Sequence, residues 1–66
     1  MTRKHYEALV KALADVAARN GKHAPVITEA VLAVAEVCAA DNARFNRDKF
    51  LAAYTAYRAE FAKAQA

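Results

Sequence analysis

The sequence contains only one cysteine and one glycine, and each scarcity excludes a class of site. Cys38 cannot form a disulfide within the chain, and no Cys/His pattern typical of structural zinc accompanies it. Because Gly21 is the sole glycine, no glycine-rich loop can cradle a phosphate group. His5 and His23 would lie about 27 Å apart on a straight helix, too far to share a metal ion. We therefore expect no metal, no cofactor and no enzymatic activity.

Long apolar runs and a strong excess of one charge are also missing. No run approaches the roughly 20 apolar residues of a membrane span, and the first residues lack the apolar core of a signal peptide. The net charge of +3 is too small to indicate general affinity for nucleic acids. A lone cysteine on an apolar helix face fits a reducing compartment. These features predict a soluble cytoplasmic protein that does not bind membranes.

The sequence is rich in alanine, and its apolar residues recur with the periodicity of an α-helix. With 66 residues, the chain is expected to form a single helical domain, 1–66. Pro25 suits the first turn of a helix, where its missing N–H costs nothing. Two short connections join the apolar-periodic segments, and short connections imply antiparallel neighbours. The sequence therefore predicts an all-α, three-helix up-down-up bundle with helices at about residues 3–20, 25–41 and 47–63.

The middle segment, residues 26–40, is apolar around most of its circumference when wound as a helix. Its only charges, Glu29 and Glu36, fall on one narrow stripe. Such a helix must be covered on more than one side, so it is either the central element of the bundle or also an oligomer seam. We expect the other two helices to cover it. The arc predicted to face them consists of Val26, Ile27, Ala30, Val31, Val34, Val37 and Cys38.

The third helix has a sharp start signal and an aromatic ridge. Asn46 is the predicted N-cap, and Phe45 and Phe50 have the spacing of a hydrophobic staple. The ridge is formed by aromatic residues at 4-3-4 spacing, the spacing of packed helices. It consists of Phe50, Tyr54, Tyr57 and Phe61, with Arg58 beside it.

The ridge has two possible uses. Phe50 and Tyr54 are expected to cover the middle helix, whereas Tyr57, Arg58 and Phe61 face either the core or a partner. A chain of this length buries only about 60% of the surface that it exposes when unfolded, so a second copy would relieve a shortage of core. We expect a homodimer. The predicted partner-binding residues are Tyr54, Tyr57, Arg58 and Phe61, because Tyr and Arg are enriched at interface hot spots.

One end of the predicted bundle gathers basic residues. In an up-down-up arrangement, the start of the first helix and the turn before the third lie at the same end. That end is suited to phosphate or to an acidic protein surface, or is an ordinary solvated end partly neutralised by nearby carboxylates. Its members are Arg3, Lys4, Arg44, Arg47 and Lys49, with His5 nearby.

Two segments resemble small helical proteins encoded by tailed bacteriophages and prophages. They are the Met-x-Arg-Lys-x-Tyr start at residues 1–6 and the element Phe-Asn-Arg-Asp-Lys-Phe-Leu-Ala-Ala at residues 45–53. Members of that group mostly have no assigned function, so the resemblance implies a phage origin more than an activity. The chain departs from the group after Ala53, where many such proteins soon end. Here the helix continues for about three more turns.

These observations lead to two functional expectations. The first is a non-catalytic phage-encoded protein that binds a host or phage protein through a helical surface, and so inhibits or redirects it. The alternative is a small DNA-binding regulator of helix-turn-helix type that uses the basic end. Against the alternative, the third helix is rich in alanine and aromatic residues.

Overall fold

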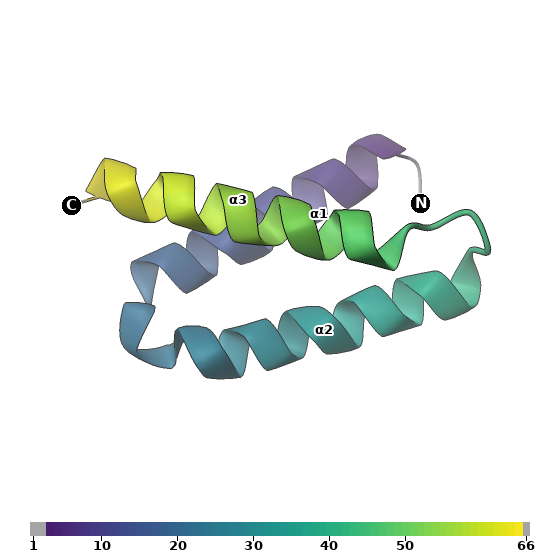
Figure 1. Ribbon diagram of the computed structural model, residues 1–66, viewed down its shortest axis with the longest axis horizontal. Coiled ribbons are helices and arrows are strands. Elements are labelled where there is room, and N and C mark those ends of the chain that lie inside the picture. Colours follow the sequence, from purple (N-terminus) through teal and green to yellow (C-terminus); the bar gives the residue numbers. More distant parts are fainter. Residues whose placement is uncertain (1–2, 66) are drawn as a thin grey trace.

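The computed structural model describes residues 3–65 and shows three α-helices in an up-down-up arrangement (Figure 1). α1 runs away from the N-terminal end, α2 returns along the molecule, and α3 runs back across α1. The predicted all-α three-helix fold is confirmed, with helix ends within about two residues of the expected ones. The elements are α1 (Arg3–Arg19), the short 3₁₀ turn η1 (Gly21–His23), α2 (Ala24–Asp41) and α3 (Arg47–Gln65). Met1 of the phage-like start lies outside the described residues.

The core lies between all three helices, but α1 and α3 form the closest pair. Three members of the core are alanines with an exposed fraction of 1% or less. Because alanine side chains are small, the helix backbones can approach closely there. Larger side chains of α1 and α3 are partly buried against this core, among them Leu9, Leu13, Leu51 and Phe61. The core residues are Val10, Ala14, Ala17, Val31, Ala35, Phe50 and Tyr54.

Of the two alternatives for the middle helix, the first, that it is the central element of the bundle, is wrong. α2 contacts α1 and α3 less extensively than these two helices contact each other. Val26 and Val37, predicted to be buried, are 67% and 69% exposed. The reason is that the aromatic side chains of the three helices all stand on α1 and α3, so these two helices bury the most area by pairing with each other. Of the predicted arc, Val31 and Cys38 are buried, Ile27 and Val34 are partly buried, and Val26, Ala30 and Val37 are exposed.

Length and composition alone would allow one segment, Gly21–Asp41, to cross a membrane, contrary to the expectation from the sequence. Only 17% of its apolar window is buried within the protein. Core helices of soluble proteins and signal sequences pass the same test, so this is weak evidence for a membrane span. Glu29 and Glu36 lie inside the segment, and carboxylates are costly in the hydrocarbon region of a bilayer.

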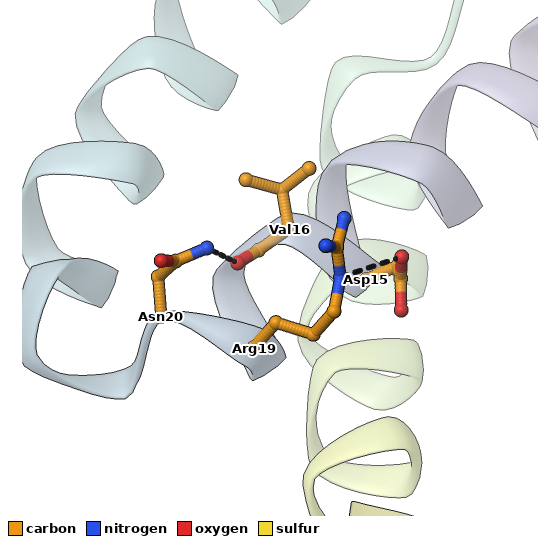
Figure 2. Close-up of polar contacts among 4 residues, drawn as sticks. All are labelled: Asp15, Val16, Arg19 and Asn20. Atoms are coloured by element: carbon orange, nitrogen blue, oxygen red, sulfur yellow. Dashed lines mark hydrogen bonds and ion pairs between the residues drawn. The ribbon is translucent and has the colours of Figure 1, made fainter.

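Side chains satisfy backbone groups where α1 ends. Figure 2 shows the Asn20 side-chain amide donating to the Val16 carbonyl oxygen at 2.8 Å, and the Arg19 guanidinium paired with Asp15 at 3.1 Å. Carbonyl groups of the last helical turn have no partner within the helix, so the Asn20 contact replaces one of the missing hydrogen bonds. Both members of the ion pair are about half exposed, which makes the pair a minor contribution to stability.

The predicted start of α3 is confirmed. The Asn46 side-chain oxygen accepts a hydrogen bond from the Lys49 backbone N–H at 2.9 Å, as an N-cap does. The rings of Phe45 and Phe50 lie 5.3 Å apart between centroids, which is the predicted staple. The cap and the staple together fix the direction in which the chain enters α3.

Replacing Asn46 by alanine should therefore lower the free energy of unfolding by about 1 kcal/mol. Asn46→Asp is the matched control, because its carboxylate can accept the same hydrogen bond and suits the positive end of the helix dipole. Urea denaturation followed by far-UV circular dichroism measures both variants. Equal losses in the two variants would show that the side-chain acceptor is not what stabilises this helix end.

Candidate partner-binding site

A groove of about 500 Å³ opens at the end of the bundle where α1 and α3 begin. Its floor is formed by aromatic rings. The Tyr6 and Phe45 centroids lie 4.9 Å apart, and Phe45 lies 5.3 Å from Phe50. Phe50 is buried, whereas Tyr6 and Phe45 are partly exposed. The groove therefore offers an apolar floor whose rings a ligand can still reach.

Cations from three different segments stand around this floor. Arg3 comes from the first turn of α1, Arg44 from the α2–α3 connection, and Lys49 from the first turn of α3. All three are exposed. Glu7 is the carboxylate among the lining residues. The excess of positive charge suits a ligand that carries carboxylate or phosphate groups.

The structure brings together only part of the predicted basic end. Arg3, Arg44 and Lys49 line the groove, as the topology predicted. Lys4 is exposed on α1 but does not line it. Arg47 lies at the same end but pairs with Glu36 of α2 at 3.3 Å, so its charge is partly neutralised.

Two asparagines hold the connection that carries Phe45. The Asn42 side-chain oxygen accepts a hydrogen bond from the Arg44 backbone N–H at 3.0 Å, and the Asn42 carbonyl accepts one from the Phe45 N–H at 3.0 Å. Asn46 then caps α3. Such side-chain contacts stabilise turns. Phe45 is thereby held between Tyr6 and Phe50, and the groove is preorganised before a ligand arrives.

Within the aromatic ridge of α3, Tyr54 and Arg58 are engaged inside the protein. Tyr54 is 2% exposed, and its hydroxyl forms a hydrogen bond of 2.9 Å with the Thr28 hydroxyl. The Arg58 guanidinium donates to the same Thr28 oxygen at 3.2 Å and lies 5.9 Å from the centroid of the Tyr54 ring. This polar cluster joins α2 to α3. Tyr54 therefore has almost no surface left for a partner.

The outer half of the ridge is only partly covered. Tyr57 and Phe61 are stacked, with centroids 5.8 Å apart and an interplanar angle of 16°. Both pack against the core, and the Lys11 ammonium lies 5.4 Å from the Tyr57 ring centroid, within cation–π range. The surface left for a partner, on Tyr57, Arg58 and Phe61, is smaller than the surface that the predicted ridge would have offered. Their role in binding a partner stays a prediction.

Sequence reasoning missed the floor of the groove and the role of Thr28. The sequence identifies Phe45 only as a staple residue and Tyr6 only as the last residue of the phage-like start. A usable signal existed, because a staple ring necessarily lies at the same end of a helix as its cap, which is where the basic residues gather. Only the packed structure places Thr28 against Tyr54.

Possible metal ligands are scattered within residues 3–65. That part of the chain contains no group of three or more His, Cys, Asp or Glu side chains that could hold a metal ion. Cys38 is a buried free thiol. Fold and groove together define a small three-helix protein with a groove lined by basic and aromatic residues at one end. In comparisons with known proteins, no family, curated protein or solved structure matches the chain.

Proposed function

We propose that this is a non-catalytic interaction protein that binds an acidic segment of another protein in the basic–aromatic groove. The observation that supports this most directly is the ring of three cations, Arg3, Arg44 and Lys49, around an apolar floor. A partner carboxylate would pair with the cations while a neighbouring apolar side chain covers Tyr6 and Phe45. Electrostatic and apolar contacts of this kind give an interface both its specificity and its affinity.

A protein ligand fits this groove better than a nucleic acid. Nucleic-acid affinity rests on contacts to several phosphates, and one potential contact, Arg47, is already paired with Glu36. The groove is also mainly apolar, which favours side chains over a sugar–phosphate backbone.

The proposal also includes the origin of the protein, the source of its partner and the compartment in which it acts. The resemblance of residues 1–6 and 45–53 to phage and prophage proteins supports a phage origin, a host or phage protein as the partner, and action in the bacterial cytoplasm. Inhibition or redirection of a host factor is the role that fits. The partly exposed edges of Tyr57 and Phe61 would extend the contact along α3.

The test is affinity capture from a bacterial host lysate, quantified by mass spectrometry, with charge reversals on the groove. Arg44→Glu combined with Lys49→Glu should reduce capture of the specific partner by about tenfold or more, because it replaces attraction by repulsion. The matched control is Lys22→Glu with Lys63→Glu, which makes the same change of net charge at the opposite end of the bundle.

The outcomes of this capture separate the two classes of ligand. A partner that survives nuclease treatment and is lost only with the groove variant supports the proposal. Equal losses with the groove variant and the control would contradict it, since only net charge would then matter. Capture that disappears after nuclease treatment would assign the groove to nucleic acid.

A small DNA-binding regulator is the second candidate function, favoured by the position of Arg3, Arg44 and Lys49 at one end. Binding to mixed-sequence DNA that weakens steeply with salt, and is lost on Arg44→Ala with Arg47→Ala, would support it. Helix-turn-helix recognition would require base-reading side chains on the outer side of α3. Beyond Arg47, Asp48 and Lys49 in the first turn, the exposed residues of α3 are Ala52, Thr55, Ala56, Ala59, Glu60, Ala62, Lys63 and Ala64.

A further inference from the structure

The outer side of α2 carries an apolar stripe that nothing within the described chain covers. Its five residues recur at 4-3-4-3 spacing, the spacing of a helix–helix seam. Three large apolar side chains are exposed among the described residues, Val16, Val26 and Val37, and two of them lie on this stripe. The stripe consists of Val26, Ala30, Ala33, Val37 and Ala40, all exposed.

The same helix buries a different face. Val31, Ala35 and Cys38 point into the bundle, on roughly the opposite side of α2 at about 100° per residue. α2 therefore has two apolar sides, and the bundle covers one of them. This is the arrangement expected of a helix that serves both a core and an interface.

The protein exposes more surface than a compact monomer of its size. The chain exposes 4770 Å², whereas a compact monomer of 7.2 kDa is expected to expose about 4,100 Å². The excess of roughly 650 Å², summed over the whole molecule, is of the same order as the ~800 Å² that each partner contributes to a standard interface. A stable dimer needs an area of this order.

We propose that two copies of the chain pair antiparallel through the outer side of α2. The stripe complements itself across a two-fold axis. With the axis between Ala30 and Ala33, these alanines meet at the centre, where small side chains allow close approach of the helices. Val26 of one copy then packs against the partner's Val37, and the reverse contact repeats at the other end.

The charges beside the stripe give this pairing a distinctive electrostatic signature. Glu29 and Glu36 line one border of the stripe, and antiparallel pairing brings the same border of each helix together. Glu29 would therefore lie near the partner's Glu36. Within each copy, Arg47 sits 3.3 Å from Glu36 and reduces the resulting repulsion. Reversing the charge of Glu29 should convert the remaining repulsion into attraction.

The test is the molar mass in solution, measured by sedimentation equilibrium on the full chain over about 10 µM to 1 mM. We expect a monomer–dimer equilibrium. Val37→Glu should weaken dimerisation by at least about tenfold, because it places a carboxylate in the seam. Glu29→Lys should tighten it by about threefold to tenfold. Both side chains are exposed, so the monomer should keep its fold, which circular dichroism checks.

Ala56→Glu, on the exposed side of α3, is the matched control and should leave the equilibrium unchanged. A monomer throughout the concentration range overturns the proposal, as does equal weakening by Ala56→Glu and Val37→Glu. No change with Glu29→Lys overturns the antiparallel pairing. A monomer that binds phosphatidylcholine vesicles, and is released by Val37→Glu, assigns the stripe to a lipid surface instead of a second copy.

Discussion

Replacing Tyr54 by alanine should lower the free energy of unfolding by about 3–5 kcal/mol, the range for removing a buried aromatic ring. Tyr54 is 2% exposed and packs in the core cluster with Val10, Val31 and Phe50. A domain of this length has a total stability of only about 3–10 kcal/mol. The variant should therefore be largely unfolded, or melt far below the wild type, when followed by far-UV circular dichroism.

Tyr54→Phe separates the ring from its hydroxyl. The phenylalanine keeps the packing but loses the hydrogen bond to Thr28, whose oxygen can still accept from Arg58. The expected loss is about 0.5–1.5 kcal/mol. Because dimerisation would add stability, both variants must be compared at the same protein concentration. A wild-type melting curve for Tyr54→Ala would show that this ring does not hold the core together.

Ala14→Leu should cost about 1–3 kcal/mol, even though leucine is nearly as good a helix former as alanine. Ala14 has no exposed surface and lies in the core, where α1 and α3 are in close contact. Additional carbon atoms must push helices apart there. In a domain of this size, each 1 kcal/mol lowers the melting temperature by about 4–8 °C.

Ala12→Leu is the control, because it makes the same change on an exposed position of the same helix. It should change the free energy of unfolding by no more than about 0.5 kcal/mol, so its melting temperature should stay close to that of the wild type. If both variants melt alike, then α1 does not pack against its neighbours through Ala14. Scanning calorimetry, with circular dichroism to confirm helix content, provides both measurements.

The features that could be predicted from the sequence are those with local causes. Pro25 and Asn46 mark helix starts through the chemistry of their own turns, and the short connections imply antiparallel neighbours. The position of α2 could not be predicted in the same way. It depends on where the largest side chains stand on the other two helices, and an apolar surface alone does not say which helix will cover it.

Of the candidate site, the basic residues could be predicted from the sequence, whereas the aromatic floor could not. Topology alone places Arg3, Arg44 and Lys49 at one end, since helix directions follow from connection lengths. The floor requires Tyr6 to meet Phe45 across two segments, which depends on the crossing of α1 and α3. The engagement of Tyr54 and Arg58 by Thr28 likewise depends on the register between α2 and α3.

The close pairing of α1 with α3 has a consequence for how the chain folds. These helices stand at opposite ends of the described sequence, so all of α2 is a loop that must be closed before the main core can form. Contacts between distant parts of a chain form more slowly than local ones. During synthesis on the ribosome, α1 and α2 would therefore wait without a stable core until α3 emerges.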